Sequence, residues 1–423
     1  MFKKSILPLL EGFLLFWALA CFYVSGISRV TFQPDESQWI GTSAVFEAYF
    51  SGDFDSPLWQ MSYWTTTQPP LARYVIGLGR RAGGLDAADL NAPWDWQQDV
   101  QTNTAAGRMP SAQLLWWSRL PMALLEALSV LIGFVLLKRA GGKTPAYLWV
   151  GLALLSSYLP QMLGRAMGES TLLACVTGCV WLSARLLRNS AEKPQPLYLD
   201  FLFLGILIGL AESAKLNGLA VLAAEFALVL IISLRLKLDR ALKLRFGLIS
   251  ALILILASQF TFLALNPFLW SDPFTRTGML FRDRIFEMRL QQLQYPAARL
   301  SGLLAHIQVE VPRIFQDYAG LHFDGAMWLN LAFCFIGLAL LGIKAIKFLK
   351  GQGAGPAAMA ILFIGGAVTF PSLCTPLDWD RYYLFPVYFS TLAIAAGMGG
   401  LLSLIFRLIN KRPKQVTLPS ESN

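Results

Sequence analysis

The feature that most constrains this chain is a series of long apolar runs. Two of them are LPLLEGFLLFWALACFYVSGI (7–27) and FGLISALILILASQFTFLALNPFLW (246–270). A helix needs about 20 residues to cross a hydrocarbon core of about 30 Å, and both runs reach that length. Hydrophobic residues make up 55% of the chain and charged residues only 14%, which excludes a soluble protein. Because the runs lack the alternation of barrel strands, the sequence predicts an all-α polytopic membrane protein.

Ten segments are predicted to cross the membrane as a helix bundle. They are 7–28, 114–137, 146–163, 170–187, 198–213, 216–234, 246–267, 326–348, 356–374 and 382–408. Basic residues concentrate in short connections on one side of these spans, as the positive-inside rule requires. Both termini are therefore predicted to be cytoplasmic, and the compact loops favour a prokaryotic plasma (inner) membrane. The same distribution accounts for the net charge of +9 without nucleic acid as a partner.

Two long segments connect spans on the opposite, outer side, at about 29–113 and 268–325. Ordered loops on a rigid scaffold commonly carry function, so the functional site is expected there. Within the second loop, FRDRIFEMRLQQLQY (281–295) is predicted to be a lid or surface helix. The chain, 1–423, is interpreted as a single transmembrane catalytic domain. Its end, 412–423, is predicted to be a disordered cytoplasmic tail.

Cysteine and histidine usage argues against a metal centre. The five cysteines lie mostly inside or at the ends of apolar spans, and the chain has only two histidines. Packing is the expected role of these cysteines, rather than a disulfide framework or a zinc site.

Asp35 and Glu36 directly follow the first span, in VTFQPDESQWIG (30–41). The functional interpretation is a general base on the outer face, with the second carboxylate orienting a substrate or binding a cation. The structural alternative is that Pro34 begins a helix whose first turn favours acidic side chains. The local sequence leaves both interpretations open.

Lys215 breaks both the hydropathy and the charge topology, because every other lysine lies in a predicted cytoplasmic segment. An ammonium group at the outer interface suits a lipid-borne phosphate. The alternative is an ion pair with Glu212, three residues earlier. Arg165 and Glu169 stand four residues apart before the fourth span, which favours an ion pair between them. Alternatively, Arg165 faces a phosphate.

Two further stretches hold candidate substrate contacts. A Pro-Pro pair precedes a short amphipathic helix with Arg73 and Tyr74, which is expected to lie in the membrane interface. These side chains are candidate substrate contacts, and a compatible structural interpretation is a clamp that holds the first outer loop onto the bilayer. At the start of the last span, Arg381 is a candidate phosphate ligand and Tyr382 a candidate to stack on a sugar. The alternative is that Asp380 and Arg381 cap the helix.

The order of these motifs is more specific than any one of them. An acidic pair follows span one, a Pro-Pro-Leu helix lies in the first outer loop, and an Arg precedes span four. A Lys-x-x-Gly, an Asn-Pro-x-x-Trp-x-Asp-Pro and an Arg-Tyr-Tyr-x-x-Pro follow in that order. Over about residues 5 to 400 the chain resembles the GT-C superfamily. Within it, the chain is similar to the protein O-mannosyltransferases and to their relatives that move aminoarabinose onto lipid A.

This resemblance implies an inverting glycosyltransferase that takes a sugar from a polyprenyl-phosphate carrier in the membrane. The acceptor is a hydroxyl of a protein, lipid or glycan at the outer face. The resemblance makes Asp35 the base and Glu36 its neighbour. It makes Lys215, Arg165 and Arg381 the donor phosphate ligands. The remaining expected substrate contacts are Arg73, Tyr74, Glu169 and Tyr382.

Two positions depart from the pattern of the relatives. Gln68 stands where many of them have His, and Glu169 stands where Asp is commoner. No resident cofactor or metal is expected, and a divalent cation is the alternative.

Two other functions fit part of the sequence. The first is a transporter or flippase for a lipid-linked sugar or anion, with Glu11, Glu126 and Glu225 as intramembrane carboxylates. A transporter built from duplicated halves is disfavoured, because the sequence has no apparent internal repeat. The second is an inactive relative that scaffolds a cell-envelope complex.

Overall fold

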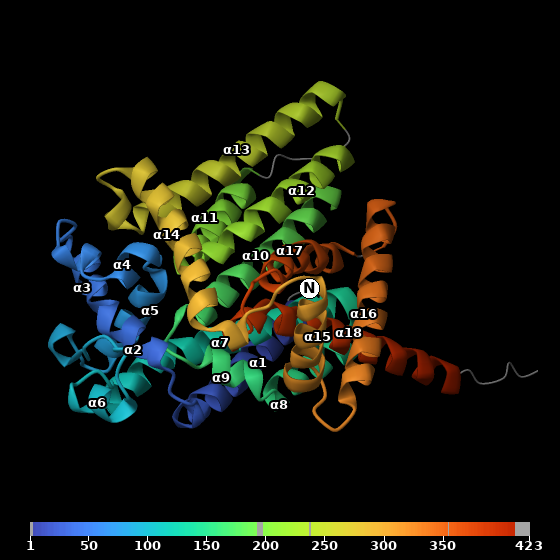
Figure 1. Ribbon diagram of the computed structural model, residues 1–423. Coiled ribbons are helices and arrows are strands. Elements are labelled where there is room, and N and C mark those ends of the chain that lie inside the picture. Colours follow the sequence, from blue (N-terminus) through green and yellow to red (C-terminus); the bar gives the residue numbers. More distant parts are fainter. Residues whose placement is uncertain (1–2, 193–197, 237, 354, 411–423) are drawn as a thin grey trace, which may run out of the picture.

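A computed structural model describes residues 3–192, 198–236, 238–353 and 355–410 (Figure 1). Within these ranges the chain is built from helices, and strand pairing is limited to one isolated antiparallel bridge, between Arg299 and Leu377. The predicted all-α membrane fold is thereby confirmed. The predicted disordered tail, 412–423, lies outside the described residues.

The α-helices follow one another along the chain with short 3-10 turns between some of them. They are α1 (Lys3–Gly26), α2 (Pro34–Gly41), α3 (Val45–Ser51), α4 (Tyr63–Thr67), α5 (Leu71–Ala82), α6 (Val100–Ala105), α7 (Ala112–Gly141), α8 (Lys143–Leu155), α9 (Tyr158–Leu163), α10 (Gly168–Glu192), α11 (Tyr198–Ala214), α12 (Ala220–Arg235), α13 (Arg240–Ala264), α14 (Pro273–Gln294), α15 (Leu303–Pro312), α16 (Ala326–Leu349), α17 (Pro356–Leu373) and α18 (Leu384–Ile409). Four further short elements are used below: η5 (Leu216–Leu219), η6 (Pro267–Leu269), the π-helical η8 (Arg313–Tyr318) and η9 (Asp380–Tyr383).

Among the described residues, eight helices are long and apolar enough to cross a membrane: α1, α7, α10, α12, α13, α16, α17 and α18. The other two predicted spans, 146–163 and 198–213, correspond to shorter helices. The first is divided, because α8 ends at Leu155 and α9 begins at Tyr158. The second is α11, which has 17 residues. Both pack inside the bundle, α8 against α7 and α18, and α11 against α10 and α13.

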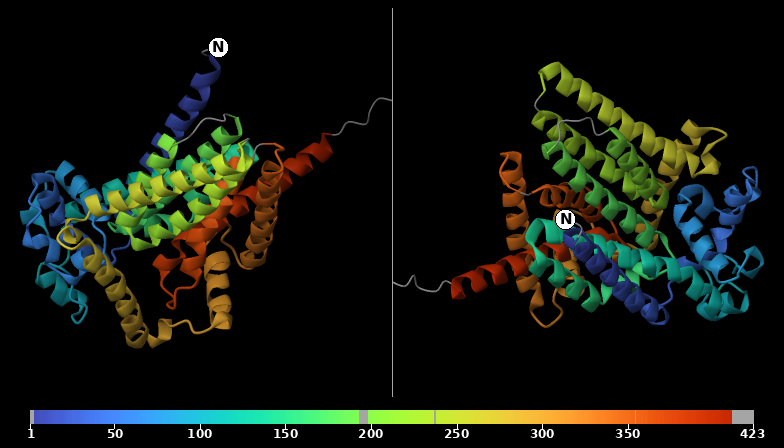
Figure 2. Two further views of the ribbon diagram at one scale, coloured as in Figure 1. Left: turned by 90° about the horizontal axis from the view of Figure 1, so that it is seen from above. Right: turned by 180° about the vertical axis from the view of Figure 1, so that it is seen from behind.

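The two outer loops contact each other at one end of the bundle. Tyr74 on α5 donates a hydrogen bond of 2.8 Å to the carbonyl of Leu265, just after α13. Tyr63 on α4 donates one of 2.9 Å to Glu287 on α14. These contacts join residues about 200 positions apart, and the second view of Figure 2 has α2 to α5 and the start of α14 on the same side. A site built from both loops is therefore geometrically available.

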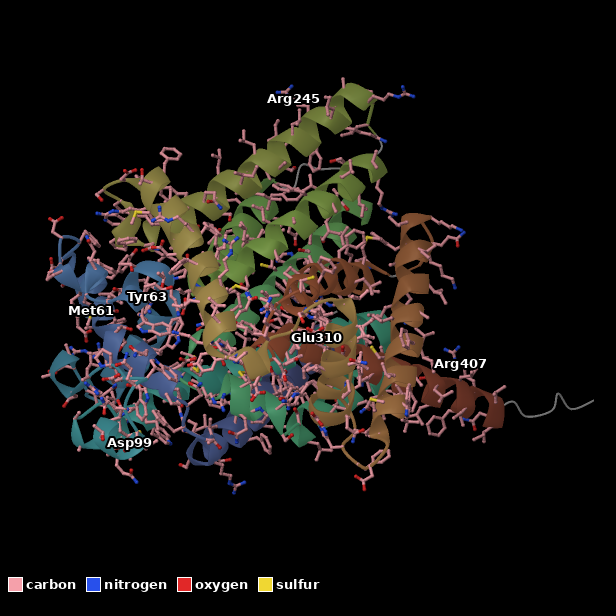
Figure 3. All side chains as sticks on the ribbon, viewed as in Figure 1. Met61, Tyr63, Asp99, Arg245, Glu310 and Arg407 are labelled. Atoms are coloured by element: carbon pink, nitrogen blue, oxygen red, sulfur yellow. The ribbon has the colours of Figure 1, made fainter. Side chains whose placement is uncertain are left out.

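Labelled residues of the first outer loop and of two basic connections lie in different parts of the molecule (Figure 3). Tyr63 and Asp99, in the first outer loop, lie together at one end of the molecule (Figure 3). Arg245 and Arg407, from two segments predicted to be cytoplasmic, lie far from that end in the same view.

Two buried aromatic side chains inside the bundle donate hydrogen bonds to backbone carbonyls of α7. The Trp149 indole on α8 donates to the Val130 carbonyl at 2.9 Å, and the Tyr388 hydroxyl on α18 donates to the Ser129 carbonyl at 2.7 Å. The two rings pack edge to face with their centroids 4.8 Å apart. These contacts bring α7, α8 and α18 together in the centre of the molecule.

The crossing of α16 and α18 depends on two glycines that face each other. A Cβ added at Gly337 would collide with the Ala393 carbonyl, and one added at Gly397 would collide with the Phe333 carbonyl. Small residues at such crossings let helix backbones approach closely in a membrane. A larger side chain at either glycine must push the two helices apart.

We therefore expect Gly337→Val to destabilise the protein by about 1–3 kcal/mol, the usual cost of overpacking. Gly342→Val is the matched control, because the space beside Gly342 on the same helix is open. Thermal unfolding in detergent measures both. Equal melting temperatures for the two variants would contradict the close crossing.

Candidate active site

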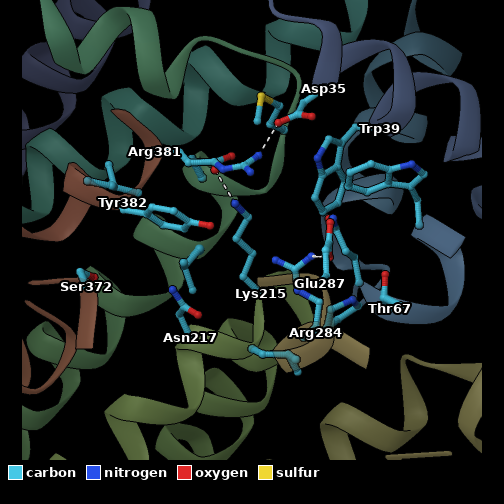
Figure 4. A pocket seen from close by; sticks show the side chains of 18 of the residues that line it. Asp35, Trp39, Thr67, Lys215, Asn217, Arg284, Glu287, Ser372, Arg381 and Tyr382 are labelled. Atoms are coloured by element: carbon cyan, nitrogen blue, oxygen red, sulfur yellow. Dashed lines mark hydrogen bonds and ion pairs between the residues drawn. The ribbon is translucent and has the colours of Figure 1, made fainter. Parts of the chain in front are cut away.

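A cleft of about 870 Å3, including its open mouth, lies where the two outer loops meet the bundle (Figure 4). Its wall comes from α2, α4, α10, η5, α14, the end of α17, η9 and the first turn of α18. Five of the sequence-predicted site residues line it: Asp35, Glu169, Lys215, Arg381 and Tyr382. The chain therefore brings together groups that are more than 300 positions apart in sequence.

Every charged group in the cleft wall has a partner of opposite charge. Arg381 pairs with Asp35, Lys215 with Glu169, and Arg284 with Glu287. The formal charges of these six groups sum to zero. The cations keep further N–H donors beside their carboxylate partners, so an anionic ligand can bind them in addition to these carboxylates or in place of them.

Asp35 occupies its position because the first turn of α2 is fixed on both sides. Gln33 caps the helix by accepting from the Asp35 amide at 2.5 Å, and Pro34 stands at the first helical position. The Glu36 carboxylate bonds back to the Gln33 amide at 3.1 Å, which completes a capping box. The acidic first turn that the sequence offered as a structural alternative is therefore present, and it positions Asp35 at the cleft.

Glu36 itself does not line the cleft. Its carboxylate is fully buried and forms a bidentate ion pair with Arg119 of α7, with distances of 2.8 and 2.6 Å. The Ala166 amide donates to the same carboxylate at 2.8 Å. With the Gln33 contact, four donors occupy the two oxygens, so Glu36 holds α2 against α7 and the bend before α10. Arg119 was missed from the sequence, since an arginine within an apolar span carries no sign of its partner.

Arg73 and Tyr74 also lie outside the cleft wall. The buried Arg73 guanidinium donates to Thr42 Oγ1 at 2.7 Å and to the Trp64 carbonyl at 2.8 Å, and lies over the Trp39 ring. Burial lowers its pKa to about 9, so it remains charged at neutral pH. Tyr74 ties α5 to the end of α13, and burial raises its pKa, which keeps the hydroxyl as a donor. Both side chains thus tie α5 to neighbouring segments of the protein.

The ion pairs differ from those that sequence spacing suggested. Glu169 pairs with Lys215 instead of Arg165, and Arg165, in the bend between α9 and α10, is not among the residues that line the cleft. Glu212 accepts a hydrogen bond from Gln259 at 3.1 Å. Gly168 allows the approach of Lys215, since a Cβ there would lie 2.9 Å from Lys215 Cε.

Arg381 and Tyr382 project from η9 into the cleft, beside Trp379. The Arg381 guanidinium lies 4.5 Å from the centroid of the Trp379 ring, and the Tyr382 ring is nearly parallel to that ring. Within the described structure, the Tyr382 hydroxyl and Glu169 Oε2 are buried without a hydrogen-bond partner. Two unpartnered polar atoms on a cleft wall suit a ligand rich in hydroxyl groups.

The helix α14 contributes two site residues, Arg284 and Glu287, that the sequence analysis placed in a lid or surface helix. Glu287 accepts from Tyr63 as well as pairing with Arg284. Burial and the Glu287 charge raise the pKa of the Tyr63 hydroxyl, so it remains a donor. The spacing of three residues between Arg284 and Glu287 was the sequence feature that could have indicated an ion pair on one face of this helix.

The intramembrane carboxylates lie outside the cleft wall. Glu11 pairs with Lys138 at 2.5 Å, Glu225 accepts from Ser183 at 2.5 Å, and Glu126 is buried on α7. In the part of the chain that the structure describes, no three His, Cys, Asp or Glu side chains converge on a metal-binding geometry.

A family model described as dolichyl-phosphate-mannose-protein mannosyltransferase matches residues 37–272, more than half of the chain. The chain belongs to this family. The resemblance to protein O-mannosyltransferases that the motif order indicated is thereby confirmed. No curated protein matches the sequence.

Solved structures similar to this member of the mannosyltransferase family include three complexes. The S. cerevisiae protein O-mannosyltransferase Pmt1-Pmt2 complex bound to the sugar donor has 17% identity and a TM-score of 0.40, over 60% of this chain and 33% of that one. ArnT from Cupriavidus metallidurans bound to undecaprenyl phosphate has 16% identity and a TM-score of 0.49, over 94% of this chain and 62% of that one. The Archaeoglobus fulgidus oligosaccharyltransferase AglB, in complex with an inhibitory peptide and a dolichol-phosphate, has 15% identity and a TM-score of 0.48, over 98% of this chain and 53% of that one. The chain thus spans between a third and just under two thirds of these chains.

The family match covers only part of the cleft of this mannosyltransferase family member. Glu169 and Lys215 lie inside the matched range, whereas Asp35 precedes it and Arg284 and Arg381 follow it. The structure brings the outlying residues onto the same cleft wall.

Proposed function

We propose that the protein is an inverting glycosyltransferase that moves a sugar from a polyprenyl-phosphate carrier to an acceptor hydroxyl of a protein, lipid or glycan. The observation that carries the proposal is the meeting of Asp35, Lys215 and Arg381 in one cleft. The family description supports it and makes mannose on dolichyl phosphate the first donor to test. The chain requires no resident cofactor in this proposal, and a divalent cation is tested by adding EDTA to the assay.

The ion pairs of the cleft suggest how donor binding prepares the base. The donor phosphate takes the place of Asp35 on Arg381 and of Glu169 on Lys215, because a phosphate forms strong charge-assisted hydrogen bonds with both cations. Asp35 is then released from its partner beside the anomeric carbon. Binding of the anion and activation of the base are one event in this scheme.

The transfer step balances without a further reactant. The acceptor oxygen attacks the anomeric carbon from the face opposite the phosphate, and its proton passes to Asp35. The bond between the anomeric carbon and the phosphate oxygen breaks, and the bonding electrons leave with the phosphate. Lys215 and Arg381 stabilise the negative charge that develops there. Tyr382 and Glu169 are proposed to bind sugar hydroxyls through their unpartnered atoms.

The cleft is proposed to open on the outer face of a prokaryotic plasma membrane, with both termini in the cytoplasm. Positive-inside topology supports this orientation, because the short basic connections lie on the opposite side of the spans. A polyprenyl chain would then lie in the bilayer with its phosphate at the cleft.

Donor consumption in membranes tests the proposal. We expect a wild-type preparation to transfer label from a radiolabelled polyprenyl-phosphate sugar. Lys215→Ala is expected to lower the transfer rate by about 10- to 100-fold, which corresponds to the free energy of one hydrogen bond to a charged group. Lys347→Ala is the control, because Lys347 is exposed in the last turn of α16. The measurement is the transfer rate at several donor concentrations.

Two results would contradict the proposal. Equal rates for Lys215→Ala and Lys347→Ala would remove Lys215 from the donor site. Binding of a lipid-linked sugar with no donor consumed by wild type would favour a flippase.

A further inference from the structure

Helix α14 has two chemically different faces. Leu280, Arg284, Glu287 and Gln291 recur at helical spacing, and this inward face carries the two cleft residues and Leu280, the one buried residue of α14. Arg282, Ile285, Phe286, Arg289 and Leu293 recur at helical spacing on the opposite side, the outward face. The helix is therefore held to the protein by one narrow stripe, and its outward face is left for another partner.

The outward face combines large apolar side chains with arginines. Phe286 is 66% exposed and Leu293 is 74% exposed, and Ile285, directly before Phe286, is also exposed. The Arg289 side chain is exposed, and so is Arg282, whose Nε contacts Asp283 at 3.2 Å. An amphipathic helix with this composition is typical of a membrane surface, with apolar groups among acyl chains and arginines at lipid phosphates.

Helix α15 continues the same kind of surface. Leu303, Leu304 and Ile307 are all exposed, and Leu303 is 78% exposed. In the left view of Figure 2, the helices α14 and α15 project from the bundle and are joined at their far ends by a short connection. Both helices thus carry large apolar side chains that are exposed on the surface of the protein.

The connection between α13 and α14 places the start of this surface at the membrane boundary. Helix α13, one of the eight candidate spans, ends at Ala264, and α14 begins at Pro273 after the single turn η6. Trp270 lies in this short link, with its indole bonded to the Leu263 carbonyl at 2.6 Å. Tryptophan at the end of a span is typical of the headgroup region. Helix α14 therefore begins within a few residues of the end of a candidate membrane span.

We propose that the outward face of α14, together with Leu303, Leu304 and Ile307 of α15, is a docking surface for anionic phospholipids of the leaflet beside the cleft. The apolar side chains lie among the acyl chains, and Arg282 and Arg289 bind the headgroup phosphates. Because the inward face of α14 carries Arg284 and Glu287, lipid docking also fixes the position of one cleft wall. This inference does not depend on the proposed reaction.

Spin labels on the full chain in vesicles test the docking. The five native cysteines are replaced, and a nitroxide is attached at Phe286→Cys or Leu293→Cys, with Thr104→Cys in the first outer loop as the aqueous control. Frequent collision of the nitroxide with oxygen indicates that the label lies in lipid. Frequent collision with a water-soluble nickel chelate indicates that it lies in water. We expect the labels at 286 and 293 to favour oxygen and the label at 104 to favour nickel, in vesicles of phosphatidylcholine with about 30% phosphatidylglycerol.

The arginines are tested in the same vesicles. Arg282→Gln and Arg289→Gln are each expected to lower the ratio of docked to undocked helix about fivefold, which corresponds to about 1 kcal/mol per arginine. The loss is expected with phosphatidylglycerol and not with phosphatidylcholine alone. Arg81→Gln is the matched control, because Arg81 is an exposed arginine at the end of α5, on the first outer loop.

Three outcomes would overturn the inference. Labels at 286 and 293 that report water in both lipids would remove the membrane contact. Labels shielded from both reagents would indicate that another protein surface covers α14. Equal ratios in neutral and anionic vesicles, unchanged by the arginine variants, would remove the role of lipid charge.

Discussion

Asp35→Asn is expected to lower sugar transfer by about 100- to 10,000-fold, the usual contribution of a general base. The amide keeps the size of the side chain but accepts a proton far more weakly than a carboxylate. It also leaves Arg381 without its partner, so donor binding is expected to persist or to tighten. The measurement is transfer under saturating donor, with donor affinity determined separately.

Asp53→Asn is the control for this substitution, since Asp53 is exposed in the first outer loop. It is expected to transfer sugar at the wild-type rate. If Asp35→Asn retains the wild-type rate at saturating donor, the base must be another group. If it loses donor binding together with transfer, Asp35 acts in binding and its assignment as the base loses support.

Arg119→Met is expected to destabilise the protein by about 3–5 kcal/mol, because it leaves the Glu36 carboxylate buried without its counter-charge. Both side chains of this pair are at most 3% exposed, so water cannot replace the arginine. The first turn of α2 loses its anchor to α7, and Asp35 lies in that turn. Thermal unfolding in detergent measures the stability, and the transfer assay measures the displacement of Asp35.

A second substitution separates the charge from the packing. Glu36→Gln in the Arg119→Met background removes the unpaired carboxylate and is expected to recover part of the lost stability. Arg108→Met is the control, because the Arg108–Asp95 pair is about a third exposed and is expected to contribute at most about 1 kcal/mol. A similar loss for Arg119→Met and Arg108→Met would contradict the structural role of Glu36.

The sequence indicated Asp35 and Glu36 as a pair, and their roles separate only in the fold. Adjacent residues of a helix point about 100° apart, so one side chain faces the cleft while the other faces α7. Nothing in the local sequence decides which of the two faces inward. Arg119, which decides it, lies 83 positions later in the chain.

The ion-pair partner of Lys215 was the other feature that the spacing of residues along the sequence could not predict. Lys215 required a partner because a lysine among apolar residues is costly, and the sequence offered Glu212. The fold supplies Glu169 instead, 46 positions away, through the bend before α10 and the absence of a side chain at Gly168. The same bend separates Arg165 from Glu169.

The sequence by itself determined the membrane class, most of the helices that cross the bilayer and the two loops that contribute Asp35, Arg284 and Glu287 to the cleft. Hydropathy and charge asymmetry act along the chain at the scale of one helix, so they can be read without tertiary contacts. Only the tertiary structure decided which charges pair, that Arg284 and Glu287 reach the cleft, and that Arg73 and Tyr74 lie outside its wall. Those outcomes depend on which helix faces meet, because electrostatic pairing within a few ångströms is set by packing between segments distant in sequence.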